Sequence, residues 1–85
     1  MNNRIVLFHL HEAAEELNRI IADLEQDSAY DTEEFSVAMG HLYHHLNTAW
    51  NGRDQTDQEF NSCTGDSFRR LRRFPPQSEF PGLEE

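Results

Sequence analysis

The sequence is short of cysteine, of basic residues and of long apolar runs. Its single cysteine, Cys63, forms no internal disulfide, so the chain needs no oxidising compartment. Seven basic residues against sixteen acidic ones give a net charge of -9, which leaves no basic face for a nucleic-acid backbone. No stretch reaches the roughly 18–20 apolar residues of a membrane span. We therefore expect a cytoplasmic protein that binds neither nucleic acid nor membrane.

Motifs that would indicate catalysis are missing as well. The zinc-protease pattern HExxH has a Glu beside its first His, whereas His41 is followed by Leu42. The Glu-x-x-His motif of di-metal carboxylate bundles does not occur. Cys63 and the scattered serines lie in or near predicted loops, with no local signature that selects a His partner for a nucleophile. The sequence therefore favours a role without catalysis.

Apolar residues are also scarce, at 36% of the chain, and the mean hydropathy is -0.81. A domain of 85 residues buries only about 60–65% of the surface that its unfolded chain exposes. Association of protomers enlarges such a small core. We therefore predict a homodimer.

The stretch 35–50, FSVAMGHLYHHLNTAW, holds the only Trp and three of the five His. At about 100° per residue, its apolar side chains fall in one arc of about 120°, with Tyr43 at the edge. The pattern predicts a helix over residues 32–51 whose apolar stripe faces the core. The members of this stripe are Phe35, Ala38, Met39, Leu42, Leu46, Ala49 and Trp50.

A second amphipathic helix is predicted over residues 4–26, and the short connection between the two makes them antiparallel neighbours. Ile5 and Phe8 lie off its apolar stripe. Either the first residues are not helical, or the C-terminal segment or another copy of the chain covers this side. We favour coverage, because aromatic residues near the C-terminus also need a packing partner. The stripe that is expected to face the core consists of Val6, Leu10, Ala13, Ala14, Leu17, Ile21 and Leu24.

Capping signals mark the ends of both helices. Asn2 or Asn3 is a candidate N-cap for the first helix. Asp31, followed three residues later by Glu34, fits a capping box for the second, and Thr32 is the alternative cap. At the end of the second helix, Gly52 is expected to adopt a left-handed C-terminal cap.

Beyond these helices, Thr56 with Glu59 is a candidate cap for a single helical turn, and a short third helix is predicted over residues 64–74. Its block RRLRR, residues 69–73, is interpreted as a basic complement to the acidic faces of the first two helices, and an acidic partner or a phosphate is the alternative. Residues 1–74 are then one helical domain and 75–85 a flexible C-terminal tail. The predicted fold is all-α: an antiparallel helical hairpin with a short third helix, two copies of which pair into a four-helix bundle.

Histidine spacing supplies the one candidate for chemistry. His41 and His45 are four residues apart on one side of the second helix, and His9 and Glu16 border the stripe of the first helix in the same way. Together these residues form a conceivable site for a divalent transition metal. The competing interpretation is structural, because histidines beside an apolar stripe commonly fill space and bond to carboxylates or backbone.

Aromatic residues supply the candidate interface. Those expected at a contact between copies of the chain are Phe8, Tyr43, Trp50, Phe68 and Phe74. The sequence favours a small acidic helical interaction module that acts as a homodimer, with a metal-binding bundle as the alternative.

Overall fold

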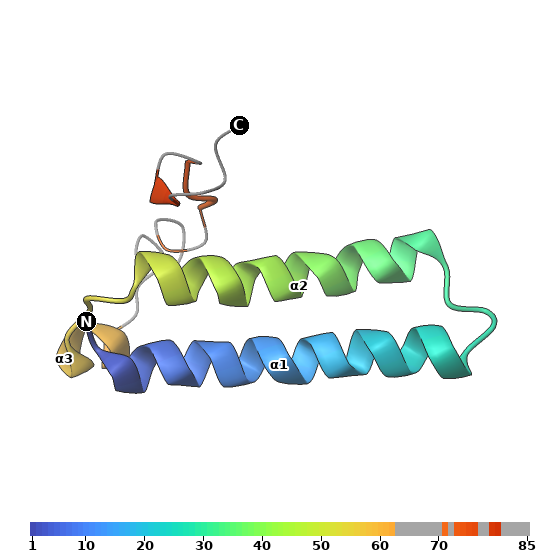
Figure 1. The fold of residues 1–85 in the computed structure, drawn as a ribbon, viewed down its shortest axis with the longest axis horizontal. Coiled ribbons are helices and arrows are strands. Elements are labelled where there is room, and N and C mark those ends of the chain that lie inside the picture. Colours follow the sequence, from blue (N-terminus) through green and yellow to red (C-terminus); the bar gives the residue numbers. More distant parts are fainter. Residues whose placement is uncertain (63–70, 72, 77–78, 81–85) are drawn as a thin grey trace.

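A computed structural model describes residues 1–62, 71, 73–76 and 79–80 of the chain. Within these residues there are three helices and no strand: α1 (Asn3–Gln26), α2 (Thr32–Asn51) and α3 (Asp57–Asn61). The helices α1 and α2 form a long antiparallel hairpin, and α3 lies at the end that holds the N-terminus (Figure 1). The fold is all-α, as predicted, and the bounds of α1 and α2 match the predicted helices to within one residue.

Each helix begins at a side-chain cap. The Asn2 side chain accepts a hydrogen bond from the backbone N–H of Ile5, and Asp31 accepts one from Glu34 at 2.9 Å. Because the first backbone N–H groups of a helix have no partner within it, these oxygens stabilise the first turn. Thr56 begins α3 with a complete capping box, in which Glu59 reaches back to the cap.

Gly52 ends α2, but the predicted left-handed conformation is wrong. Its backbone has φ of -100° and ψ of 12°, which other residues also adopt. A Cβ at this position would lie 2.9 Å from the backbone oxygen of Thr48 and 2.9 Å from the side-chain oxygen of Gln55. Close packing, rather than backbone conformation, therefore explains the glycine.

The contact between α1 and α2 uses a different side of α1 from the predicted one. The core between the helices consists of Ala13, Ile20 and Leu42, with Ala38 and Met39 packed against it. Of the predicted α1 stripe only Ala13 is buried, whereas Ile5, which lies off the stripe, is 1% exposed. The buried residues of α1 are Ile5, His9, Ala13, Glu16 and Ile20.

The prediction failed because it assumed that the most apolar side of α1 faces α2. In the hairpin that side is rotated to one flank, and a less apolar side that includes His9 and Glu16 meets α2. On α2 the outcome is mixed: Leu42 and Ala49 are buried as predicted, while Phe35 is exposed.

The helix α3 and the N-terminus hold the open end of the hairpin together. The backbone N–H of Asn2 donates to the carbonyl of Arg53 at 2.6 Å, and its side chain donates to the carbonyl of Gln55 at 2.9 Å. Phe60 of α3 packs edge-to-face on Phe8, with ring centroids 5.4 Å apart. The side of α1 that carries Phe8 is thus contacted by Phe60 of α3. This contact was not predicted from the sequence.

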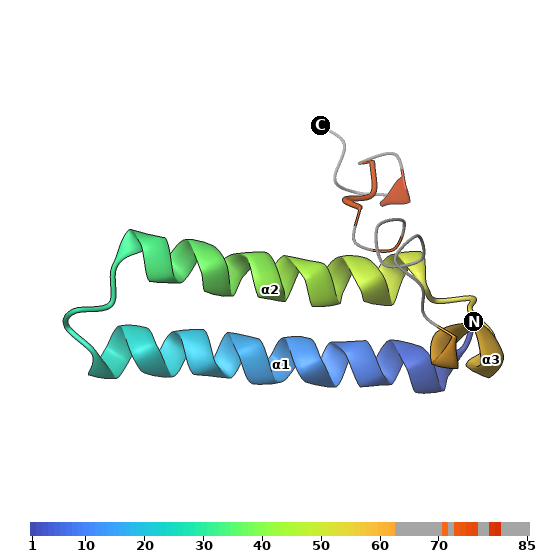
Figure 2. The same cartoon turned by 180° about the vertical axis from the view of Figure 1, so that it is seen from behind.

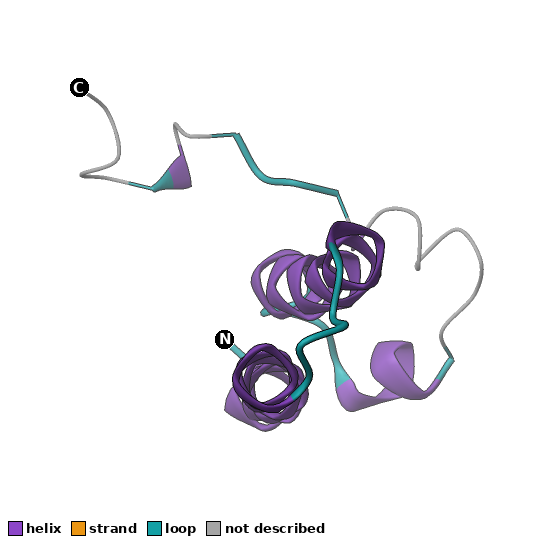
Figure 3. Cartoon of the chain, turned by 90° about the vertical axis from the view of Figure 1, so that its right-hand side faces the viewer, coloured by secondary structure: helices purple, strands orange, loops and turns teal. Residues whose placement is uncertain are grey.

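The C-terminal segment contacts α2 near the same end (Figures 1 and 2). The Asn51 side chain donates hydrogen bonds to the carbonyls of Leu71 and Arg73, at 2.7 and 2.6 Å. Viewed along the hairpin, α3 and the C-terminal segment lie on different sides of it (Figure 3). Most of the predicted third helix, residues 64–74, falls outside the described residues. Three of the four arginines of the basic block, Arg69, Arg70 and Arg72, also fall outside the described residues.

Among the described residues, neither the long helices α1 and α2 nor the short α3 combines the length and the apolar character that a bilayer crossing requires.

Candidate functional site

One flank of the hairpin carries apolar side chains that are largely exposed. Those of α1 follow each other at alternating spacings of three and four residues, so that they form a single line along the helix. Leu17 and Ile21, in the middle of this line, are each 45% exposed. The α1 residues of this line are Leu7, Leu10, Ala14, Leu17, Ile21 and Leu24.

The helix α2 adds a second line on the same flank. Tyr43 and Leu46 are 43% and 41% exposed, and both line a groove that they share with Leu10 of α1. The two lines therefore border one continuous surface, which we call the apolar face. The α2 residues of the apolar face are Phe35, Met39, Tyr43, Leu46 and Trp50.

A groove of about 680 Å³ opens on the apolar face at the end that holds the N-terminus. Val6 and Leu10 of α1 form one wall, and α2 forms the other with Leu46. The C-terminal segment closes one side with Phe74 and Phe80. Since the walls are almost entirely apolar, the groove suits an apolar occupant rather than a charged one.

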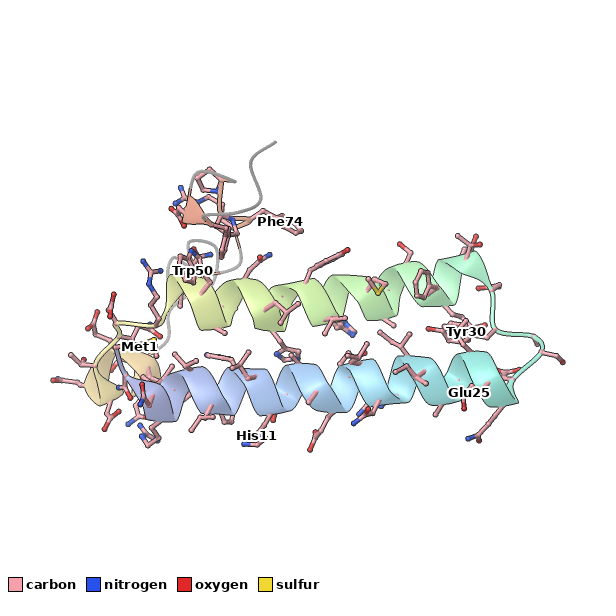
Figure 4. All side chains as sticks on the ribbon, in the orientation of Figure 1. Met1, His11, Glu25, Tyr30, Trp50 and Phe74 are labelled. Atoms are coloured by element: carbon pink, nitrogen blue, oxygen red, sulfur yellow. The ribbon has the colours of Figure 1, made fainter. Side chains whose placement is uncertain are left out.

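Trp50 occupies the boundary between α2 and the C-terminal segment (Figure 4). The guanidinium carbon of Arg53 lies 4.0 Å from the centre of its ring, within the range of a cation–π contact. The ring of Phe80 is 4.7 Å away, and the indole N–H donates to a carboxylate oxygen of Glu79 at 2.5 Å. Tyr43 makes a second aromatic contact with the segment, through Phe74 at 5.5 Å.

The structure separates the aromatic residues that were predicted for an interface. Tyr43, Trp50 and Phe74 all line the groove on the apolar face. Phe8 points to the other flank, nine residues and hence half a turn around α1 from Leu17, where it meets α3. Phe68 lies outside the described residues.

The opposite flank has an acidic hollow of about 370 Å³. Glu16 is only 9% exposed there, and its carboxylate pairs with Arg19 at 2.9 Å and lies 3.8 Å from His41. Tyr30 lies between the helices at the loop end (Figure 4), where burial and the nearby carboxylate of Asp23 raise the pKa of its hydroxyl. The charge of Glu16 is thus balanced by Arg19 within α1, whereas the hollow as a whole stays acidic.

The four predicted metal ligands fall into two pairs. His41 lies close to Glu16, whereas the charge of His45 acts on His9. Burial, followed by the charges of His45 and His44, lowers the pKa of His9. Its Nε2 atom is buried and has no hydrogen-bond partner among the described residues. No group of three or more His, Cys, Asp or Glu side chains is arranged to hold a metal ion in the part of the chain that the structure describes. The metal site stays a prediction.

The apolar face was visible in the sequence as a stripe, but its role was assigned to the hairpin contact. Leu7 was missed altogether, although it extends the spacing of Leu10 and Leu17 by one step. No protein-family model, no curated protein and no solved structure matches this chain. A function for the protein must therefore be argued from the geometry of the apolar face.

Proposed function

We propose that the protein is a small acidic helical interaction module that acts as a homodimer, and that the apolar face is the contact between the two copies. The carrying observation is the exposure of regularly spaced large apolar side chains on the same flank of both helices. Leu10, Leu17 and Ile21 are each more than two-fifths exposed. A monomer would leave all of this surface in water, whereas burial of one Leu or Ile side chain stabilises by about 1.5–3 kcal/mol.

The size of the apolar face supports a stable dimer. The 24 residues of α1 span about 36 Å, and two packed helices are about 20 Å wide. A face of these dimensions gives about 700 Å² per protomer, close to the roughly 800 Å² per partner of a standard protein interface. An interface of this area would also enlarge the small core between α1 and α2.

The spacing of the apolar face supports a second copy of the chain as its occupant. A twofold interface must be complementary to itself. The α1 line is symmetric about a point between residues 15 and 16, so that Leu7 corresponds to Leu24 and Leu10 to Ile21. The α2 line is symmetric about a point between residues 42 and 43, and the 3.8 Å contact between Glu16 and His41 sets the two centres at nearly the same level.

The composition agrees with this proposal. A net charge of -9 favours solubility and opposes nucleic-acid binding. The lone Cys63 makes no demand for an oxidising compartment, which supports a cytoplasmic location.

The proposal is tested by sedimentation equilibrium of the full chain and two matched variants. Leu17→Glu introduces a carboxylate at the centre of the apolar face. Val37→Glu makes the same charge change on α2, at a position that is 62% exposed and half a turn away from Leu46. Wild type and Val37→Glu are expected at twice the 10.0 kDa chain mass. Leu17→Glu is expected to weaken dimerisation by at least about 100-fold, because it leaves an unpaired carboxylate in a buried interface.

Two results would contradict the proposal. One is a wild-type monomer at tens of micromolar. The other is equal dimer affinity in both variants, which would place the contact on another surface. Circular dichroism of both variants checks that α1 and α2 are still helical, since Glu is nearly as good a helix former as Leu.

A further inference from the structure

The charges of the hairpin are distributed unequally between its two ends. From residue 20 to residue 40, around the loop between α1 and α2, the sequence has six acidic residues and neither Arg nor Lys. This loop end therefore has a charge of about -6 in a short stretch of the molecule. The acidic residues are Asp23, Glu25, Asp27, Asp31, Glu33 and Glu34.

The other end of the hairpin, which we call the terminal end, is close to neutral among the described residues. Its cations are paired with acidic groups: Arg4 lies 2.8 Å from Asp57, and the N-terminal ammonium lies 3.5 Å from Asp54. Arg53 also lies here, where it lines the groove and lies 3.9 Å from Asp54. The contrast is therefore between a strongly acidic end and an end with balanced charges.

Two twofold arrangements bring the apolar faces of two hairpins together. If the axis runs parallel to the helices, both loop ends lie at the same end of the dimer, and α1 packs on the α2 helix of the partner. If the axis is perpendicular to the helices, the loop end of each copy lies over the terminal end of the other, and α1 packs on the α1 helix of the partner. In both arrangements neighbouring helices are antiparallel, so helix dipoles do not distinguish them.

We propose that the second copy binds with its axis perpendicular to the helices, so that the two loops lie at opposite ends of the dimer. This inference rests on the proposed homodimer and adds its orientation. The same-end arrangement would bring two groups of six carboxylates to about 10–20 Å of each other, which is about one to two Debye lengths, so that their repulsion is only partly screened. Like charges across an interface oppose that arrangement, and the opposite-end arrangement sets each acidic group against a neutral surface.

The apolar side chains fit the opposite-end arrangement. Leu24, which is 56% exposed at the loop end, then meets Leu7 of the partner subunit. Leu17 meets the small side chain of Ala14 of the partner subunit. On the α2 side, Phe35 is placed over the groove of the partner, which is open at the terminal end. The groove thus receives an aromatic side chain that the hairpin itself leaves 38% exposed.

The orientation is tested by pulsed electron spin resonance on the full chain in a Cys63→Ser background. A nitroxide on Ser28→Cys reports the separation of the two loops. In the opposite-end dimer this separation is expected at about 35 Å or more, the length of α1. In the same-end dimer it would be about 10–20 Å, set by helix packing distances.

A mixed sample supplies the complementary distance. Ser28→Cys and Asn3→Cys chains are labelled separately and combined, and a short separation of about 20 Å or less is expected between the two positions. A loop-to-loop separation under about 25 Å would overturn the orientation while leaving the dimer intact. Failure of the homodimer itself is recognised separately, because sedimentation of the labelled chains would then give a monomer, which removes the orientation with it.

Discussion

At the scale of single residues, Gly52 and Gly40 are expected to respond in opposite ways to the same substitution. A Cβ at Gly52 would lie 2.9 Å from the backbone oxygen of Thr48, whereas a Cβ at Gly40 would have no atom of the described residues within 4 Å. We expect Gly52→Ala to destabilise the protein by about 1–3 kcal/mol through this clash. Gly40→Ala, in the middle of α2, should stabilise by about 0.5–1 kcal/mol. Urea denaturation measures both, and equal signs would contradict the close contact at Gly52.

His9 makes the stability of the hairpin depend on pH. It is 9% exposed, and burial with the charges of His45 and His44 lowers its pKa in the folded state from 6.5. The unfolded chain therefore binds a proton more readily than the folded one. The contribution of a neutral His9 to the free energy of unfolding is fully present above about pH 6.5, and it is lost as the pH falls from there through the lowered pKa.

We therefore expect the free energy of unfolding to fall between pH 7 and pH 5, and the His9→Leu variant to show less of this fall. The matched control is His11→Leu, whose side chain points away from α2 (Figure 4). It should retain the acid-dependent loss. Urea midpoints at several pH values provide the measurement, and an unchanged pH profile in His9→Leu would assign the loss to other groups.

At the scale of the elements, Asn2 connects α1, α3 and the segment between α2 and α3. Its side chain caps α1, and it donates to the carbonyl of Gln55 at 2.9 Å and to Asp57 of α3 at 3.0 Å. We expect Asn2→Ala to destabilise by about 1–3 kcal/mol, from the lost cap and the lost hydrogen bonds. The neighbouring Asn3→Ala should have little effect. Thermal unfolding of the two variants compares them, and similar midpoints would show that Asn2 holds no special position.

The helices themselves were predictable, because their signals are local. Asp31 marks the start of α2 by its position before Glu34, and Thr56 marks α3 before Glu59. The rotation of α1 was not predictable from such signals. An apolar stripe indicates which side of a helix is favourable to bury, but it does not indicate whether the next helix or another molecule covers that side. Ile5 is buried although it lies off the stripe, because it falls on the same side of α1 as the buried Ala13 and Ile20.

At the scale of the whole molecule, coupled folding and dimerisation should make thermal stability depend on concentration. Mass action stabilises a dimer as the protein is concentrated. We expect the Tm to rise by about 3–5 °C for each tenfold increase in concentration. Scanning calorimetry between a few micromolar and several hundred micromolar measures the rise. A Tm that does not change over this range would indicate that the apolar face is not needed for folding.

The candidate site was predictable only in part. Tyr43, Trp50 and Phe74 were expected at an interface, and all three line the groove of the apolar face. Phe8 was placed in the same group because its exposure was foreseen, but the exposed side of one helix can meet several neighbours. Its contact with Phe60 depends on the position of α3, which is fixed by hydrogen bonds far apart in the sequence.

Trp50 is the only tryptophan in the chain, and it lines the groove of the apolar face between Arg53 and Phe80. The intrinsic fluorescence of the whole protein therefore comes chiefly from this position. Removal of water from the groove shifts indole emission to shorter wavelengths. We therefore expect the association of two unlabelled chains to cause a blue shift of the Trp50 emission. The same signal would follow the release of Phe80 as a red shift, which gives the protein an internal optical probe at the junction of α2 and the C-terminal segment.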